Sequence, residues 1–175
     1  NKPEARSLES VNGAIDFNEV SFSYLPGKPI LKQVSFSIKA GEFVAVAGGS
    51  GSGKSTLLNL IPRFYDVDSG SVTIDDTQIK MVTLDSLRKK IGYVGQDHYL
   101  FDGTIWENLI YGDPDATEEE IFSAARKANA HDFIRSLQKG YETQVGQNGV
   151  KLSGGQRQRL SLARAFLATP RILLL

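Results

Sequence analysis

The sequence contains no cysteine, only two histidines and no long apolar run in its 175 residues. The absence of cysteine excludes disulfides, thiolate metal sites and cysteine nucleophiles, and it agrees with a reducing compartment. His98 and His131 cannot form a histidine metal cluster by themselves. No apolar stretch approaches the ~20 residues of a membrane span, and the opening NKPEARSLES has the features of neither a signal peptide nor a methionine start. We therefore expect the chain to be a segment of a longer protein.

Charge of either sign is also not in excess, since 20 basic residues balance 20 acidic ones. No global field draws the protein to nucleic acid or to an anionic membrane surface, so anion binding must be local. A hydrophobic content of 41% allows one sizeable core and a small appended subdomain.

The order of patterns along the chain predicts an α/β domain. Residues 1–12 resemble a linker, and the two-residue alternation from Ile15 to Ile38, interrupted by LPGKP, predicts an antiparallel ribbon. The run EFVAVA lacks alternation, as expected of a central strand that is covered on both faces. We further predict a helix in STLLNLIPRFY, strands in SVTIDD and IGYV, and a buried parallel strand in the final ILLL.

A helical region follows, from about residue 96 to residue 168. Thr117 precedes Glu120 by three residues, which is the pattern of a capping box. The apolar face of the predicted helix comprises Ile121, Ala124, Ala125 and Ala128.

The stretch GGSGSGKST fits the pattern G-x-x-x-x-G-K-[ST] between a predicted buried strand and a predicted helix. Its glycines permit positive φ, so that backbone N–H groups turn inward around a phosphate chain. The helix start adds its partial positive charge. Lys54 would supply a charge for the β- and γ-phosphates and the Ser55 hydroxyl a ligand for Mg²⁺. The simpler alternative is a flexible glycine-serine loop. The candidate binding residues are Gly48, Gly49, Ser50, Gly51, Ser52, Gly53, Lys54, Ser55 and Thr56.

A second stretch, LSGGQRQRL, lies about 100 residues further on. Ser153 is a favourable N-cap and two glycines follow it, so free N–H groups would form a second anion site at a helix start. An ordinary capped helix with solvent-facing arginines is the alternative. Two phosphate sites in one small domain are hard to explain with one ligand.

GGSGSGKST, GYVGQD and LSGGQRQRLSLARA, in this order, resemble the nucleotide-binding domain of an ATP-binding cassette (ABC) transporter. The resemblance covers about residues 13–175, and IDFNEVSFSY, FDGTIWENLIYG and GYETQVGQNGVKLSGGQ resemble the exporter branch. It implies a P-loop NTPase fold with a mostly parallel core sheet, an N-terminal antiparallel β subdomain and a helical subdomain that carries the signature.

The resemblance also implies roles for individual residues. Tyr24 matches the aromatic residue that stacks on adenine, with a plain sheet residue as the alternative. Gln96 matches the glutamine of the Q-loop, which is thought to touch Mg²⁺ and the attacking water; a surface-turn glutamine is the alternative. Ser153, Gly154, Gly155 and Gln156 match the signature, which in this family contacts the γ-phosphate held by the opposite subunit. One phosphate site would thus act in cis and the other in trans.

Four features depart from the family pattern. Gln147 stands where exporters usually carry glutamate, which puts coupling contacts there in doubt, and Asp75 and Asp76 suggest a changed turn. We interpret His98 as exposed and His131 as a helix-cap or packing residue rather than a catalyst. The final strand matches one that normally leads into the Walker B aspartate and the catalytic glutamate, and the 175 residues end before both acids. We expect the 175 residues alone to be inactive.

The sequence therefore predicts a domain that binds MgATP and, in the complete protein, hydrolyses ATP as a head-to-tail dimer to power export. Lys54 and Gln96 are its candidate catalytic residues, and Ser55 and Gln96 its candidate metal ligands. The expected partners are a second nucleotide-binding domain and transmembrane domains fused upstream, without nucleic acid, at the cytoplasmic face of a membrane. The alternatives are a soluble ABC-type ATPase that acts on DNA or ribosomes, and a non-hydrolysing regulatory ATP-binding module.

Overall fold

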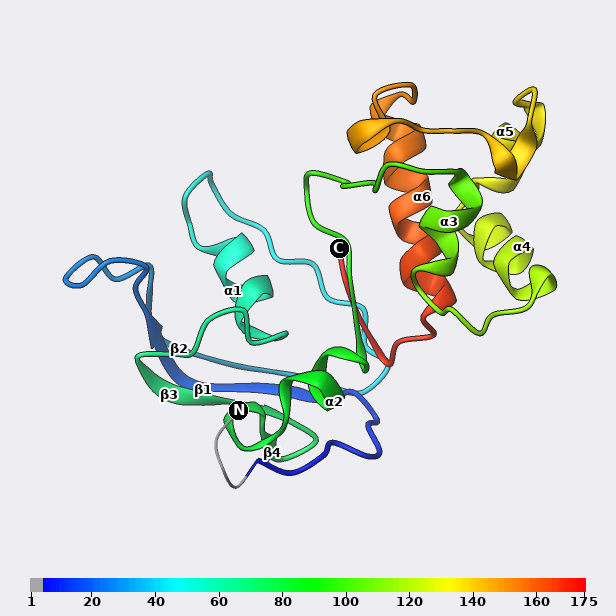
Figure 1. The fold of residues 1–175 in the computed structure, drawn as a ribbon. Helices are drawn as coiled ribbons and strands as arrows, with labels where there is room; N and C mark the ends of the chain where they lie inside the picture. The colour runs from blue at the N-terminus through cyan, green and yellow to red at the C-terminus, as the bar shows by residue number, and fades with distance from the viewer. Residues whose placement is uncertain (1–4) are drawn as a thin grey trace. The chain divides into compact units, whose positions relative to one another are not determined.

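The computed structural model describes residues 5–175, except for the side chain of Asn148. The chain divides into two compact units, residues 1–91 and residues 92–175, which are considered separately (Figure 1). The first described strand, β1, spans Ile15–Phe22, and the last, β6, spans Ile172–Leu174.

The first unit is built on a four-stranded antiparallel sheet. Its strands are β1 (Ile15–Phe22), β2 (Leu31–Ile38), β3 (Ser69–Ile74) and β4 (Thr77–Gln78), in the spatial order β2-β1-β3-β4. An irregularity between Phe17 and Val20 of β1 interrupts the alternation, and both residues are almost completely buried. Phe17 stacks on Phe36 of β2 at 4.6 Å between ring centres. The predicted antiparallel ribbon is confirmed.

Helix α1 (Lys54–Leu60) lies in this unit, followed by the 3₁₀ turn η1 (Ile79–Met81) and helix α2 (Leu84–Arg88). The prediction extended α1 through the sequence PRFY, but the helix ends at Leu60. Ile61, the C-cap, still has helical dihedrals, but Arg63 has a left-handed φ of 55°, through which an α-helix cannot continue.

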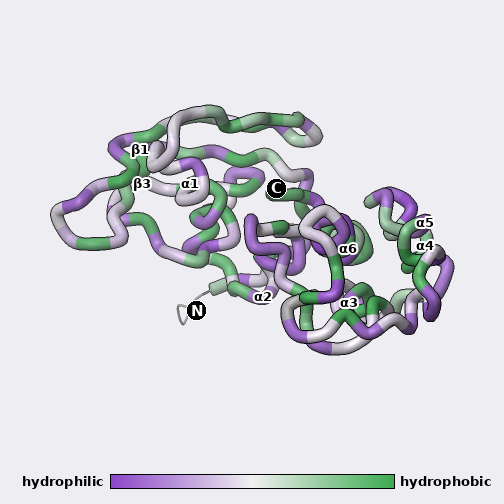
Figure 2. Tube along the Cα trace, turned by 90° about the horizontal axis from the view of Figure 1, so that it is seen from above, coloured by the Kyte–Doolittle hydropathy of each residue, from purple (hydrophilic) through white to green (hydrophobic). Residues whose placement is uncertain are grey.

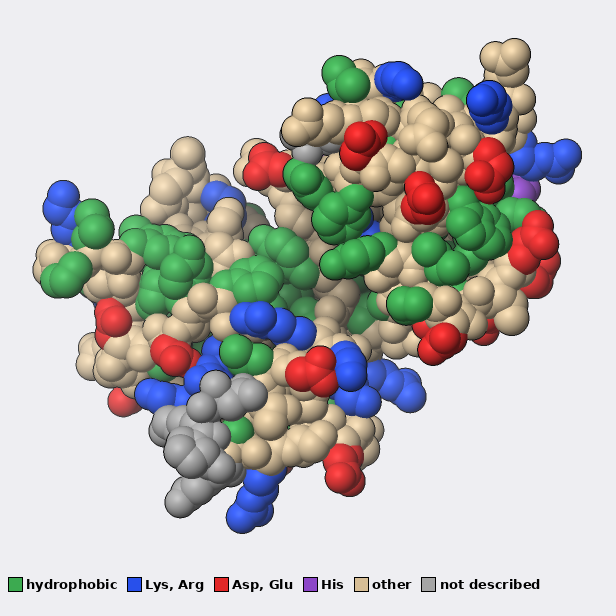
Figure 3. Space-filling model, viewed as in Figure 1, with side chains coloured by type: hydrophobic (Ala, Val, Ile, Leu, Met, Phe, Trp, Pro, Cys, Tyr) green, Lys and Arg blue, Asp and Glu red, His purple; other side chains and the backbone are tan. Residues whose placement is uncertain are grey.

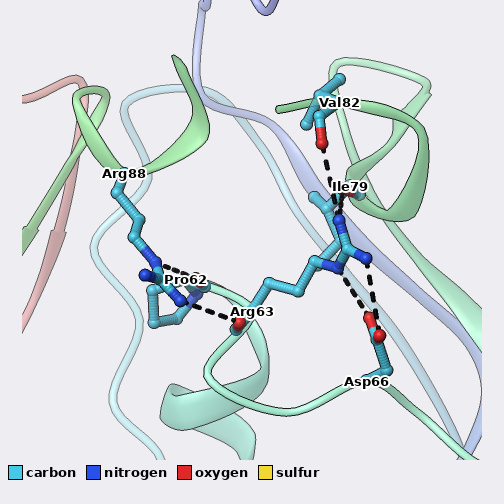
Figure 4. Close-up of polar contacts among 6 residues, drawn as sticks. All are labelled: Pro62, Arg63, Asp66, Ile79, Val82 and Arg88. Atoms are coloured by element: carbon cyan, nitrogen blue, oxygen red, sulfur yellow. Dashed lines mark hydrogen bonds and ion pairs between the residues drawn. The ribbon is translucent and has the colours of Figure 1, made fainter. Parts of the chain in front are cut away.

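An arginine network fixes the chain where it leaves α1 (Figure 4). Arg63 donates from Nε to the Asp66 carboxylate at 2.6 Å and from Nη1 to the carbonyl oxygen of Ile79 at 3.4 Å. Arg88 donates from Nε to the carbonyl oxygen of Pro62 at 3.1 Å. The segment after α1 is therefore tied to η1 and to α2.

The prediction of a central strand in EFVAVA is wrong. Residues 42–49 belong to no strand and are exposed, with Phe43 91% accessible. A strand forms only where its backbone groups find a neighbouring strand, and no described strand of the first unit pairs with this run.

Residues 5–12, predicted as part of a linker, form part of the first unit and contact its residues 81–86. Arg6 forms a parallel bridge with Val82, and the backbone N–H of Leu8 donates to the Ser86 hydroxyl at 3.0 Å. The Asp75 carboxylate accepts from three consecutive backbone N–H groups, those of residues 12–14. Asp75 and Asp76 both have positive φ, 46° and 62°, so the IDD turn is a left-handed one.

The second unit is mainly helical. Strand β5 (Ile91–Tyr93) is hydrogen-bonded to β6, and the helices are α3 (Ile105–Ile110), α4 (Glu118–Lys127), α5 (His131–Ser136) and α6 (Gly154–Leu167). The 3₁₀ turns η2 (Gly140–Glu142) and η3 (Gln147–Gly149) lie between α5 and α6. One face of each of α3, α4 and α6 packs into a common hydrophobic core, in which Ile105, Ile121 and Leu160 are at most 1% accessible.

Capping boxes begin three of these helices, at Thr104, Thr117 and Ser153. The predicted box of Thr117 and Glu120 is confirmed, as is the buried apolar face of α4. Hydrogen bonds from the Thr117 side chain and backbone lower the pKa of Glu120 from its ordinary value.

The two histidines differ in their surroundings. His131 begins α5 and its Nδ1 lies 2.8 Å from the Tyr141 hydroxyl, in an aromatic cluster with Phe122, so it is a packing residue. Burial raises the pKa of Tyr141 to about 12. The prediction that His98 is exposed is wrong: the residue is half-buried at φ 42°, and its Nδ1 has no partner among the described residues.

No helix within residues 5–175 has both the length and the apolar character needed to cross a membrane. Along the trace, hydrophobic and hydrophilic stretches alternate instead of forming one long hydrophobic run (Figure 2).

Candidate functional site

The loop Gly48–Gly53 leads directly into α1. Gly53 is the N-cap residue of α1 with φ 93° and ψ 6°, and no side chain caps the helix. Gly51 also has positive φ, 78°. A side chain at Gly53 would be strained by this φ, and its Cβ would lie 2.9 Å from Leu31 Cδ2. The first N–H groups of α1 therefore remain available to an anion.

Lys54 folds back over this loop. Its Nζ donates to the carbonyl oxygens of Gly48 at 2.8 Å and Gly49 at 2.7 Å, and it lies 3.5 Å from the Ser52 hydroxyl. The ammonium group thus stands at the mouth of the loop. An ammonium group has three N–H donors, so a phosphate oxygen could accept the one that reaches only to the Ser52 hydroxyl, or could replace a carbonyl.

A hollow of about 160 Å³ lies in front of α1. Its lining residues are Ile30, Gly51, Ser52, Gly53, Lys54, Ser55 and Thr56. Ser55 is exposed at the start of the helix, so its hydroxyl suits a Mg²⁺ ion that is mainly held by phosphate oxygens and water. Among residues 5–175 there is no group of three or more His, Cys, Asp or Glu side chains that could hold a metal by itself. The exposed Ser55 hydroxyl at the helix start would fit a metal that arrives with a nucleotide.

Tyr24 lies near the same helix. Its hydroxyl accepts a hydrogen bond from Thr56 Oγ1 at 3.3 Å, and its ring packs edge-on against Phe22 at 4.9 Å and Tyr65 at 5.0 Å. The side chain is 44% accessible, so part of the ring is open to a ligand. The structure brings Tyr24 to the loop, and adenine stacking stays a prediction.

The signature residues begin α6. Ser153 Oγ accepts from the backbone N–H of Gln156 at 3.3 Å, and Gln156 Oε1 accepts from the backbone N–H of Ser153 at 2.9 Å. Ser153, Gly154 and Gly155 are exposed, and no atom lies within 4 Å of the position of a Cβ at Gly155. The predicted N-cap is present, and the small residues leave the helix start accessible.

Gln96 lies in an exposed turn just after β5. It belongs to the second unit, as do the signature residues, whereas Tyr24 and the loop Gly48–Thr56 belong to the first. In the first unit, Tyr24 and the loop that leads into α1 lie together through the contact of Tyr24 with Thr56. Gln147 is exposed in η3.

The fold and the two helix starts define a P-loop nucleotide-binding domain, and comparison with known proteins gives its family. Residues 31–175 match the family model described as ABC transporter. A protein of Staphylococcus aureus (strain NCTC 8325 / PS 47) is 56% identical over 172 residues, covering 98% of this chain and 30% of that protein. A protein of the bovine strain RF122 / ET3-1 is 55% identical over the same shares. Both names include the words multidrug export ATP-binding/permease protein.

A solved structure of a bacterial Atm1-family ABC exporter with ATP bound matches with a TM-score of 0.96 at 43% identity, covering 99% of this chain and 30% of that one. The chain belongs to the ABC transporter family. It spans about a third of the length of these relatives. The predicted P-loop NTPase fold class is confirmed.

Sequence reasoning missed several contacts of the site. It did not predict the Thr56–Tyr24 hydrogen bond, the Asp75 anchor or the contacts of Arg164 described below. A signal did exist for the start of α3, because Thr104 precedes Glu107 by three residues in the same pattern as Thr117 and Glu120.

Proposed function

We propose that this domain binds MgATP and that the complete protein hydrolyses ATP to drive export across a membrane. The loop Gly48–Gly53 carries the proposal. Its two glycines of positive φ and an uncapped helix start offer N–H groups and a lysine to one phosphate chain.

The residues of the first unit would divide the work of binding. Lys54 exchanges its carbonyl partners for phosphate oxygens and neutralises their charge, as expected of a charge-assisted hydrogen bond. Ser55 holds Mg²⁺, which when bound supplies charge neutralisation at the β- and γ-oxygens. Tyr24 presents the open part of its ring to the adenine.

The second unit would supply the remaining groups. Gln96 is proposed to touch Mg²⁺ and to orient the attacking water. The exposed start of α6 is proposed to meet the γ-phosphate held by a second copy of the domain. Ser153 remains suited to this role because its hydroxyl accepts the cap hydrogen bond and still has its own O–H to donate.

The partners follow from the same arrangement. A head-to-tail dimer would place two nucleotides between a loop of one copy and a signature of the other. The names of the relatives combine an ATP-binding part with a permease, which supports transmembrane domains in the same chain and a location at the cytoplasmic face of a membrane. The transported substrate depends on those domains.

The test is Lys54→Ala in the full-length protein, with Lys32→Ala on the exposed surface of β2 as the matched control. We expect Lys54→Ala to abolish ATP turnover and weaken ATP binding, and Lys32→Ala to leave both unchanged. Turnover and nucleotide affinity are measured in parallel. Normal turnover in Lys54→Ala would refute the assignment of the loop.

A further inference from the structure

Arg164 of α6 joins two parts of the second unit that are 65 residues apart in sequence. Its Nη2 donates to the carbonyl oxygen of Tyr99 at 2.9 Å, and its guanidinium carbon lies 5.6 Å from the ring centre of Phe101. Tyr99 follows Gln96 by three residues, and α6 begins with the signature. One side chain therefore contacts the segment after Gln96 and belongs to the helix that carries Ser153.

The two ends of the segment from Tyr99 to Phe101 are held differently. At Phe101 the buried side chain of Asn108 accepts from the backbone N–H at 2.8 Å and donates to the carbonyl oxygen at 3.0 Å, whereas the carbonyl oxygen of Tyr99 accepts from Arg164. Leu100 is 1% accessible and enters the core of the unit, but Tyr99 is 54% and Phe101 39% accessible. Their rings contact one another edge-on at 5.4 Å, and Phe101 also contacts Tyr111 at 4.6 Å. Hydrophobic side chains reach the surface of this unit in the view of Figure 3. Leu100 anchors the segment in the core and Asn108 holds its Phe101 end, while Arg164 holds the Tyr99 end, which is nearer in sequence to Gln96.

The burial of Arg164 does not serve stability alone. Its Nη1 is buried and has no hydrogen-bond partner among the described residues. Burial lowers the pKa of its guanidinium from the ordinary value, while the neighbouring Tyr111 acts in the opposite direction. A buried donor without an acceptor is unfavourable, so the unpaired Nη1 offsets part of what the hydrogen bond to Tyr99 contributes. The presence of an arginine at this position therefore needs an explanation other than packing.

The backbone around Arg164 leaves no room for adjustment. A Cβ at Gly112 would lie 2.3 Å from the Arg164 carbonyl oxygen, so the turn after α3 rests directly on α6. The backbone from which the Arg164 side chain projects is therefore fixed by close packing against the turn after α3.

We infer that Arg164 is a positioning residue that ties the Gln96 segment to the signature helix, so that a shift of either is passed to the other. The inference rests on the proposed function, in which Gln96 and Ser153 both act on ATP. Arg164 touches neither nucleotide nor reacting water and acts through the segment that it holds.

The first experiment measures steady-state ATP hydrolysis by the full-length protein in lipid nanodiscs. Arg164→Met keeps the length of the side chain without a donor, Arg164→Lys keeps the charge without the planar fork, and Arg135→Met on the exposed face of α5 is the control. We expect kcat to fall about tenfold in Arg164→Met, the scale of a hydrogen bond to a charged group, and less in Arg164→Lys. We expect KM for ATP to stay unchanged in both Arg164 variants. Arg135→Met should leave both kcat and KM unchanged. A raised KM with normal kcat overturns the inference.

The second experiment is a double-variant cycle with Gln96→Ala. If Arg164 acts through the Gln96 segment, adding Arg164→Met to Gln96→Ala lowers turnover no further. Losses that multiply would show that Arg164 acts independently of Gln96, and they would overturn the inference.

Hydrogen exchange separates positioning from general destabilisation and does not depend on turnover. We expect the amides of residues 97–100 to exchange about tenfold faster in Arg164→Met, while those of α4 and of Phe101, whose N–H donates to Asn108, keep their rates. Faster exchange throughout the unit would mean loss of folding and overturn the inference. If the unmodified protein does not hydrolyse ATP, the proposed function fails, and this measurement alone decides the role of Arg164.

Discussion

The starts of α1 and α6 are both glycine-containing helix N-termini, yet they satisfy their backbone groups in opposite ways. Helix α1 begins after Gly53 with no side-chain cap, and the nearby Lys54 is held by loop carbonyls. Helix α6 begins with a complete capping box between Ser153 and Gln156. At the start of α1 no side chain caps the backbone N–H groups, so a ligand could accept from them. At the start of α6 the capping box already pairs the N–H groups of Ser153 and Gln156, and the helix start is exposed to solvent.

This difference suggests a division of roles. An uncapped helix start gains its missing acceptors from a bound phosphate, so it favours tight primary binding. A capped start has a fixed shape and offers fewer free donors, so it suits a contact made after the nucleotide is already held elsewhere. The proposed arrangement of a cis loop and a trans signature agrees with this division.

The largest expected effect comes from combining lesions at the two sites. Full-length subunits with Lys54→Ala and others with Ser153→Arg each form homodimers in which every site is damaged. A mixed dimer would contain one intact site, made of the loop of the Ser153→Arg subunit and the signature of the Lys54→Ala subunit. We therefore expect ATP-dependent association of differently labelled subunits only in the mixture.

Association is measured instead of turnover, because coupling between sites could silence hydrolysis even where one site is complete. Unmodified subunits labelled in the same way give the upper limit. A mixture that associates no better with ATP than either variant alone would argue that each site is built within one chain, and the division between cis and trans would be lost.

The second prediction compares a glycine from each helix start. Gly53→Ala places a Cβ at φ 93° and 2.9 Å from Leu31 Cδ2, whereas Gly155→Ala meets no atom within 4 Å. We expect Gly53→Ala to cost about 2 kcal/mol of unfolding free energy through backbone strain and crowding, and Gly155→Ala to leave stability within about 0.5 kcal/mol. Thermal unfolding of the full-length variants measures both. Equal losses would contradict the contrast.

Much of this contrast could be predicted from the sequence. The pattern of glycines with lysine and serine predicted the loop, and Ser153 before two glycines predicted the cap, because both depend on local backbone chemistry. The antiparallel ribbon and the capping box of Thr117 also followed from short-range patterns. Such features need few neighbours to form, which is why the sequence carries them.

Features that depend on distant partners were missed or mistaken. The run EFVAVA has the composition of a buried strand, but a strand needs pairing that no local pattern supplies. The Asp75 carboxylate meets backbone groups some 60 residues away, and Arg164 meets Tyr99 at a similar distance. Neither contact has a spacing rule, because tertiary packing alone brings the groups together.

The third prediction compares the two serines. Ser153→Ala removes the side-chain acceptor of the capping box, and we expect a loss of about 1 kcal/mol in stability. Ser55→Ala changes an exposed residue inside α1 that caps no helix, so stability should change by less than about 0.5 kcal/mol. Its effect should appear instead as weaker Mg²⁺ dependence of ATP binding. Thermal unfolding and nucleotide titrations with and without Mg²⁺ separate the two outcomes.

The smallest expected effect concerns Tyr24, beside the uncapped site. Tyr24→Ala removes the whole ring, and we expect it to weaken ATP binding by about 1 kcal/mol, the lower end of the range for a base stacked on an aromatic ring. Tyr24→Phe keeps the ring and loses only the acceptor of the 3.3 Å hydrogen bond from Thr56, which is long for two hydroxyl groups, so its cost should stay below about 0.5 kcal/mol. Leu25→Ala, a change at an exposed neighbour in the same loop, serves as the control for disturbance of the loop. ATP titrations of all four proteins measure the differences. If Tyr24→Ala binds ATP as tightly as the unmodified protein, the ring is only a packing residue of the sheet, and the uncapped site recognises phosphate without help from this residue.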